Sequence, residues 1–281
     1  MPVNGAFWYR SILWVIFCYI FLVLLLYVCQ RRLIYQSSHK APPATVIGEP
    51  ANKQIIYVET QDGLRLQSWF WPPAEQGKKV IVYFHGNAGA IDIRVEPTAA
   101  LVKAGYGLLL LEYRGYGGNS GQPSETGLYH DARAAINWLQ KTGIPLEKMI
   151  LLGESLGSGV AVQLATEYKQ VAGVILEAPY TSIPDVGQER LPFIPVKLLT
   201  TERFDSLRKI PNLQAPLLVL HGTADYLIPF HHGEAIFKAA PPNPHNHFVR
   251  LQNIGHVDLI FDHAAFHILP WLEQLDKEKG G

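Results

Sequence analysis

Short apolar runs that alternate with helical stretches constrain the fold of this chain more than any other feature of its sequence. Near-continuous apolarity over four to seven residues recurs in six places, at 78–86, 106–113, 149–153, 171–179, 216–222 and 247–252. Such runs are typical of strands that are covered on both faces. Helices are expected between these runs, at 91–103, 125–141, 156–169 and 231–239, and after the last of them, at 258–275. Strands that alternate with helices predict a mostly parallel sheet with helical crossovers, which places the chain in the α/β class.

Two further β-type runs precede this series. Residues 53–60 and 64–71 are joined by Gln61-Asp62-Gly63, a sequence typical of a hairpin turn. With six parallel strands after this antiparallel pair, we expect an eight-stranded sheet flanked by helices. The helix at 125–141 is the clearest, because Ser124 can cap it and its apolar residues recur at helical spacing.

An uncharged apolar segment from Ser11 to Cys29 stands apart from this domain. About 20 residues at 1.5 Å each span a hydrocarbon core of about 30 Å. A cleaved signal peptide would have a shorter apolar core and an Ala-x-Ala-like site, and a lipoprotein signal would have small residues before Cys29. A buried core helix is seldom apolar on all sides. We therefore expect an uncleaved, single-pass membrane anchor at 1–35.

The remaining chain is expected to divide into a linker at 36–50 and a catalytic domain at 51–281. The linker is rich in proline, which predicts a connection that holds the domain away from the bilayer. The flank after the apolar segment carries one basic charge more than the flank before it. That flank holds Arg31, Arg32 and Lys40, against Arg10 and the amino terminus. The difference favours a cytoplasmic catalytic domain.

Composition excludes several classes of function. The chain has 24 basic and 24 acidic residues, so charge provides no reason to expect nucleic acid as a partner. Both cysteines, Cys18 and Cys29, lie in the apolar segment, so the domain has no disulfide framework. His263 and His267 lie four apart on an expected helix, but no third ligand accompanies them. We expect neither a cofactor nor a metal, and the oligomeric state is left open.

Ser155 is the candidate nucleophile. It is the serine of a Gly-x-Ser-x-Gly pattern, which arises by chance in about one chain in ten of this length. Here the pattern follows an expected strand and precedes an expected helix, so a sharp turn would present the hydroxyl above the sheet. Gly153 and Gly157 leave room for that turn. The N–H of Leu156, at the start of the helix, would face an oxyanion.

A serine hydroxyl needs a base, and His256 is the best placed of the 11 histidines. It lies in a loop after the last expected strand, at the same carboxyl edge of the sheet as Ser155. Asp225 follows the strand at 216–222 and would fix the orientation of the imidazole. Glu177, at the end of the strand before that one, is the alternative acid.

The second oxyanion donor is expected in the loop after the first parallel strand. The backbone N–H of Asn87 is best placed there, with Ala88 as its neighbour. His85 is expected to brace this loop, and Arg114 to pin the loop at 112–121. An insertion at 181–210 interrupts the alternation near the carboxyl edge, where it would act as a lid or as a wall of the substrate site.

Together these segments resemble the α/β-hydrolase superfamily over about residues 50–275. The resemblance is closest to a membrane-anchored, single-span subgroup that includes the "bud emergence"-type proteins. It rests on the strings HGNAG, YRGYGGNSG, PSETGLYHDA, GESLGSGVA, YTSI, HGTADYLIP and GH, in that order. The resemblance implies an α/β-hydrolase fold, a triad of Ser155, Asp225 and His256, and oxyanion donors at Asn87 and Leu156. Glu112 departs from the aspartate that many relatives have at this position, which affects only the bracing of its loop.

These residues predict a membrane-tethered serine hydrolase that cleaves a carboxylic ester or a thioester through an acyl-enzyme intermediate. The tether places the site near lipid-like substrates or acylated small molecules and proteins. Two alternatives stay open. An aminopeptidase-like enzyme would need an acidic group, such as Glu177 or Asp185, to hold the substrate amine. A scaffold without catalysis would use the same fold to bind a membrane partner.

Overall fold

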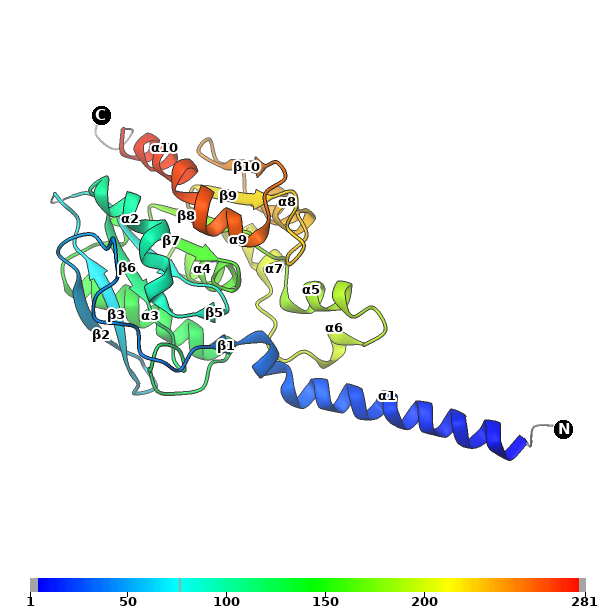
Figure 1. Ribbon diagram of the computed structural model, residues 1–281. Helices are drawn as coiled ribbons and strands as arrows, with labels where there is room; N and C mark the ends of the chain where they lie inside the picture. The colour runs from blue at the N-terminus through cyan, green and yellow to red at the C-terminus, as the bar shows by residue number, and fades with distance from the viewer. Residues whose placement is uncertain (1–4, 76, 278–281) are drawn as a thin grey trace.

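An eight-stranded sheet forms the centre of the molecule in the computed structural model, which describes residues 5–75 and 77–277 (Figure 1). The strand order is β10-β9-β8-β7-β4-β6-β3-β2. The strands are β2 (Gln54–Glu59), β3 (Arg65–Trp71), β4 (Val80–Phe84), β6 (Gly107–Leu111), β7 (Met149–Glu154), β8 (Gly173–Glu177), β9 (Leu217–Gly222) and β10 (His247–Leu251). β3 runs antiparallel to β2 and β6, and the remaining neighbours pair in parallel. The expected mostly parallel sheet of eight strands is confirmed.

Burial explains the two kinds of apolar pattern. Every residue of β4, β6, β7, β8 and β9 is buried, as expected for strands with helices on both faces. β2 lies at the edge of the sheet, and its residues alternate between exposed and buried towards its end. A continuous apolar run therefore indicates a strand with both faces covered. An alternating run indicates a strand with one covered face.

The helices cover the sheet from two sides. They are α2 (Val95–Lys103), α3 (Glu125–Lys141), α4 (Leu156–Glu167), α8 (His231–Ala239) and α10 (Ala264–Lys277). Two separate hydrophobic cores result. Leu128, Val160 and Ile236 from α3, α4 and α8 belong to one core, and Val95 and Leu272 from α2 and α10 belong to the other.

Helix boundaries follow the expected ones closely. α3 begins after Ser124, whose side chain accepts a hydrogen bond from the Gly127 N–H. The stretch 91–103 begins with a 3-10 turn, η1 (Ile91–Arg94), before α2. The expected helix at 258–275 is divided into α9 (His256–Asp258), a π-helical turn η4 (Leu259–His263) and α10.

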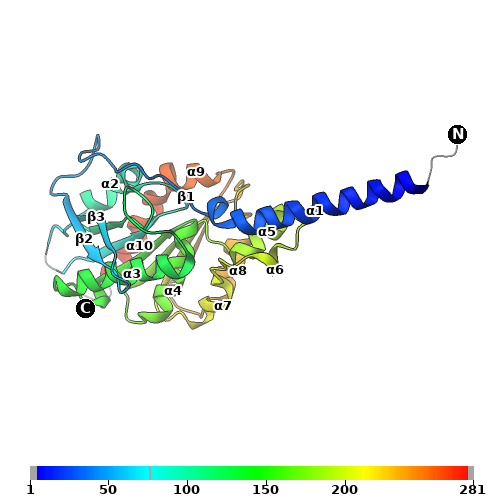
Figure 2. The same ribbon diagram turned by 90° about the horizontal axis from the view of Figure 1, so that it is seen from below.

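The N-terminal segment forms one long helix, α1 (Gly5–Ile34). Its part from Trp8 to Ile34 is long and apolar enough to cross a membrane and is not buried in the structure. Figures 1 and 2 both show α1 extending well beyond the sheet, with its second half beside the segment that carries α5 and α6.

The chain after α1 differs from the expected free linker. β1 (Gln36–Ser37) pairs in parallel with β5 (Ala88–Gly89), and the Gly117 N–H donates to the carbonyl of Ser38. Tyr35, just before β1, is buried. The first residues of the segment at 36–50 are therefore held against the domain, because their backbone groups find partners in loops that lie far away in the sequence.

The insertion expected at 181–210 lies between β8 and β9. It contains three short helices, α5 (Ile183–Arg190), α6 (Val196–Leu199) and α7 (Ser206–Lys209), and a 3-10 turn, η3 (Ile210–Asn212). α5 is capped by Ser182, whose side chain accepts a hydrogen bond from the Asp185 N–H.

Candidate active site

Ser155 occupies the sharp turn between β7 and α4. Its backbone has φ 49° and ψ −113°, a conformation that a non-glycine residue adopts only under strain. The two neighbouring glycines make the turn possible. A Cβ on Gly157 would overlap the carbonyl of Phe84, and one on Gly153 would overlap the backbone of Gly157. The Ser155 N–H donates to the carbonyl of Glu177, which fixes the turn to the adjacent strand.

The structure brings His256 and Asp225 to this serine. The His256 Nε2 lies 3.0 Å from the Ser155 Oγ, and the His256 Nδ1 lies 2.6 Å from the Asp225 Oδ2. All three residues are almost fully buried. Both distances are within reach of hydrogen bonds, the arrangement that a nucleophile, a general base and an orienting acid require.

Asp225 is held in its ionised form. Its Oδ1 accepts hydrogen bonds of 2.8 Å from the N–H groups of Leu227 and Ile228, and the His221 Nε2 lies 3.5 Å from its Oδ2. Burial by itself raises the pKa of Asp225, but the interactions with His221 and His256 outweigh it, so the pKa lies well below its usual value. A carboxylate is therefore present to orient the imidazole and to balance its charge when it is protonated.

Two backbone N–H groups flank the serine. Leu156 is the first residue of α4, and Asn87 lies in the loop after β4, where a Cβ on Gly86 would meet the side chains of Glu154 and Ser155. Neither the Leu156 N–H nor the Asn87 N–H has a hydrogen-bond partner in the part of the chain that the structure describes. The rest of Asn87 is fixed, since its carbonyl accepts from the Gln36 N–H at 3.0 Å and its Nδ2 donates to the Ile34 carbonyl at 3.2 Å.

A buried ion pair, which sequence reasoning missed, links this loop to the serine turn. Arg94 makes two hydrogen bonds to Glu154, of 2.7 and 2.9 Å, and its Nη1 donates to the Ala88 carbonyl at 2.8 Å. Tyr83 donates a further bond of 2.9 Å to Glu154. Burial raises the pKa of Glu154, but the charge of Arg94 outweighs it and lowers the pKa below its usual value. The one signal in the sequence is that Glu154 comes directly before Ser155, since Arg94 stands between Asp92 and Glu96 and looks like part of an exposed charged stretch.

The alternative acid lies elsewhere. Glu177 is buried near Glu154, and burial together with the Glu154 charge raises its pKa well above the usual value. Its carboxylate makes no hydrogen bond to His256 among the described residues, where Asp225 takes that place. Asp185 accepts hydrogen bonds from Thr181 and Ser182 and pairs with Lys197 at 2.7 Å.

Two supporting residues lie where the sequence predicts them. The His85 Nδ1 is 2.7 Å from the Gly86 carbonyl, and its Nε2 is 3.1 Å from the Glu112 Oε1. Arg114 makes ion pairs with Asp62 and Asp131, at 2.6 and 2.7 Å. The two side chains thereby brace the loops that follow β4 and β6.

One group of side chains has the composition of a metal site. Donor atoms of Glu189, His231 and His232 lie within 4.8 Å of one another. They lie outside the arrangement around Ser155, and their contacts with each other include a 3.0 Å approach of the His231 Nε2 to the Glu189 Oε1. His263 and His267, considered from the sequence, are not part of this group.

Three relatives indicate what the chain is similar to. The profile of a family described as serine aminopeptidase, S33 matches residues 75–207. Rv2307c, an uncharacterized protein of Mycobacterium tuberculosis, is 38% identical over 231 residues, which cover 82% of this chain and 81% of that one. The alpha/beta hydrolase domain-containing protein WAV2 of Arabidopsis thaliana is 32% identical over 263 residues, which cover 84% of each chain. Lysophosphatidylserine lipase ABHD12 of Danio rerio is 26% identical, over 84% of this chain and 74% of that protein.

Solved structures share the architecture. The esterase Pf2001 of Pyrococcus furiosus superimposes with a TM-score of 0.67 at 19% identity, over 83% of this chain and 98% of the esterase. At this identity the likeness shows the fold, which is the one expected from the sequence.

Proposed function

The chain belongs to the α/β-hydrolase superfamily, and we propose that it is a membrane-anchored serine hydrolase that cleaves carboxylic esters or thioesters. The hydrogen-bonded series from the Ser155 Oγ through His256 to Asp225 carries this proposal. The lipase and the esterase among the similar proteins support an acyl substrate. The apolar helix α1 supports placement in the single-span, "bud emergence"-type subgroup.

The reaction follows from the positions of these groups. His256 accepts the proton of Ser155 as the Oγ attacks the carbonyl carbon of the substrate, and Asp225 stabilises the imidazolium without taking the proton. The N–H groups of Leu156 and Asn87 bind the oxyanion, and each such donor contributes about 2.7–4 kcal/mol in the transition state.

Collapse of the tetrahedral intermediate breaks the bond to the leaving group. His256 gives its proton to the departing alcohol or thiol, and the acyl group stays on the Ser155 Oγ. A water molecule then attacks the acyl-enzyme while His256 takes its proton, and the same proton returns to Ser155 as the free acid leaves.

A fluorophosphonate probe tests this proposal on the full chain in detergent. We expect labelling of the wild type and none of Ser155→Ala. Ser120→Ala serves as the matched control, because Ser120 is an exposed serine in a loop outside the proposed triad. A wild-type protein that stays unlabelled, or a Ser155→Ala variant that is still labelled, contradicts the proposal.

An aminopeptidase-like activity is the second candidate, favoured by the description of the matching family. Such an enzyme needs a free acidic group for the substrate amine. Glu177 is buried, and Asp185 is already occupied by Thr181, Ser182 and Lys197, so neither supports that activity. Rates on p-nitrophenyl acyl esters and on aminoacyl nitroanilides separate the two, and we expect the esters to be preferred.

A scaffold without catalysis is the remaining alternative, and it predicts a different effect of Ser155→Ala on biological activity in cells. If the fold only binds a membrane partner, Ser155→Ala retains full biological activity. We expect that activity to be lost together with probe labelling, because the proposed function requires the serine hydroxyl.

A further inference from the structure

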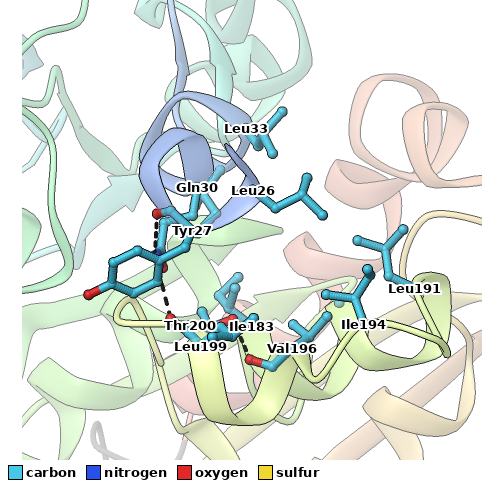
Figure 3. Close-up of a pocket in the computed structure, with 12 residues that line it drawn as sticks. Leu26, Tyr27, Gln30, Leu33, Ile183, Leu191, Ile194, Val196, Leu199 and Thr200 are labelled. Carbon is cyan, nitrogen blue, oxygen red and sulfur yellow. Dashed lines mark hydrogen bonds between the residues drawn. The ribbon is translucent and has the colours of Figure 1, made fainter. Parts of the chain in front are cut away.

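An apolar cavity of about 160 Å³ lies between the last turns of α1 and the insertion (Figure 3). Leu26, Leu33 and Ile34 line it from α1, and Ile183, Leu191 and Ile194 line it from the insertion. The cavity therefore has one wall from the helix expected to cross a membrane and one from the segment expected to cover the site.

Both walls begin beside the proposed oxyanion donors. The carbonyl of Ile34 accepts a hydrogen bond from the Asn87 Nδ2. Tyr180, three residues before Ile183, donates a bond of 3.0 Å to the carbonyl of Leu156. Hydrogen bonds therefore attach the segments that form both walls of the cavity to the two residues proposed to bind the oxyanion.

Polar side chains fix the end of α1 in this position. The Gln30 Oε1 accepts a bond of 2.8 Å from the Thr201 N–H. Arg31 and Tyr35 both donate to the buried carboxylate of Glu202, at 2.8 and 2.5 Å. Because these bonds join residues about 170 positions apart, the helix end is a part of the folded domain.

The insertion also reaches along α1 towards the membrane. The Tyr19 hydroxyl donates to the carbonyl of Phe193 at 2.9 Å. Residues 8–18 of α1, beyond this contact, extend for only about 16 Å, roughly half of a 30 Å hydrocarbon core. If α1 spans a bilayer, the tip of the insertion must lie in the near leaflet. Phe193 at this tip is 86% exposed, and Leu198, in α6 of the same insertion, is 83% exposed, as expected for side chains that lipid covers.

We propose that this cavity binds the acyl chain of a membrane lipid ester, which enters sideways from the near leaflet. In this proposal α1 has two roles: it tethers the domain to the membrane, and it forms one wall of the substrate site. The inference rests on the proposed ester hydrolysis and adds the substrate class and its route. A lipid is favoured over an acylated protein because the cavity lies beside the helix and the exposed apolar tip, where lipid chains are the surrounding solvent.

Filling the cavity tests the assignment. We expect Leu26→Trp to lower kcat/KM for p-nitrophenyl palmitate in detergent micelles at least tenfold and to leave the value for p-nitrophenyl butyrate within twofold. Leu24→Trp is the matched control, because Leu24 is exposed and lies about 200° around the helix from Leu26. Leu191→Trp, on the opposite wall, should reproduce the effect of Leu26→Trp.

The outcomes keep the two proposals apart. An equal fall for both esters, or no change for either, in variants that retain fluorophosphonate labelling overturns the acyl site. Failure of the wild type to label or to cleave either ester overturns the hydrolase itself. A third outcome is that the enzyme cleaves a palmitoyl-peptide thioester but no palmitoyl ester, and that the same variants slow this cleavage. That result assigns the cavity to acylated proteins and overturns the lipid assignment.

A fluorescence measurement tests whether the tip of the insertion lies in the membrane. Phe193→Cys, in full chains with Cys18 and Cys29 replaced by serine, accepts an environment-sensitive fluorophore such as NBD. In phosphatidylcholine vesicles we expect a blue-shifted emission at position 193 and water-like emission from the same label at Ser120→Cys. Water-like emission at both positions overturns the entry from the leaflet.

Discussion

Ser155 combines a strained backbone with a complete set of fixed neighbours. A positive φ at a non-glycine residue costs of the order of 1–3 kcal/mol and persists only where the surroundings enforce it. Here the close approach of Gly153 and Gly157 and the bond from the Ser155 N–H to Glu177 enforce it. The strain serves to expose the hydroxyl to His256 while the backbone N–H groups beside it stay free.

Asp225 provides a prediction about pH and catalysis. We expect Asp225→Asn to lower kcat on p-nitrophenyl butyrate by about 10⁴, because the amide favours the wrong imidazole tautomer. The pKa of Asp225 is lower in the folded than in the unfolded chain, so its ionisation stabilises the fold above the unfolded value of about 3.9. This stabilisation is lost as the pH falls below that value towards the folded pKa.

Unfolding of the wild type and of Asp225→Asn in detergent between pH 3 and 7 measures this effect. The stability advantage of the wild type should be largest at neutral pH and should shrink below about pH 4. An advantage that grows on acidification contradicts the assigned direction, and unchanged turnover in Asp225→Asn contradicts the catalytic role.

At the scale of elements, the ion pair of Arg94 and Glu154 joins the turn η1, just before α2, to β7 and to the loop that carries Asn87. Both side chains are almost fully buried, so each needs the other to offset the loss of hydration. The pair also holds the Ala88 carbonyl, and it therefore positions the Asn87 N–H relative to Ser155. We regard Arg94 as a positioning residue, since it acts through the loop.

Removal of Arg94 should be costly. We expect Arg94→Met to lower the free energy of unfolding by about 3–5 kcal/mol, because the Glu154 carboxylate is left buried without a partner. Arg133→Met is the control: Arg133 makes a similar pair with Glu167, but both are about 30% exposed, and the cost should stay below about 1 kcal/mol.

The double variant Arg94→Met/Glu154→Gln separates positioning from stability. It should recover part of the stability while kcat on p-nitrophenyl butyrate stays low, with KM little changed. Recovery of kcat along with stability assigns Arg94 a structural role only.

At the scale of the whole molecule, the end of the apolar helix α1 and the domain form one structure. The bonds of Gln30, Arg31 and Tyr35 to the insertion and the β1–β5 pairing attach the end of α1 to the domain. With α1 proposed as a membrane span, we expect Ser155 on the side of the membrane on which α1 ends.

The charges that flank α1 predict that side. Arg31, Arg32 and Lys40 follow the apolar segment, and we expect the domain to face the cytoplasm. A full chain with Ser120→Cys and no native cysteine should react with a membrane-impermeant maleimide only after the cells are permeabilised. Reaction in intact cells places the domain on the opposite side.

Much of the site could be predicted because its signals are local. The strands and helices follow from the periodicity of apolar residues, and Ser155 from its glycines and its place between a strand and a helix. Parallel strands deliver their carboxyl ends to one edge, so Asp225 and His256 were expected near Ser155 from topology alone. Their hydrogen bonds agree with that expectation, while their catalytic roles stay predictions.

The sequence by itself determined the order of the strands along the chain, the apolar helix and the glycine turn at Ser155, because each depends on neighbours within a few positions. Only the tertiary structure decided that β1 at 36–37 pairs with β5 in the loop after β4, that Arg94 meets Glu154, and that α1 closes a cavity against the insertion. These contacts join segments between about 50 and 170 positions apart. Their partners are selected by packing and by the need to satisfy buried polar groups, which no local pattern records.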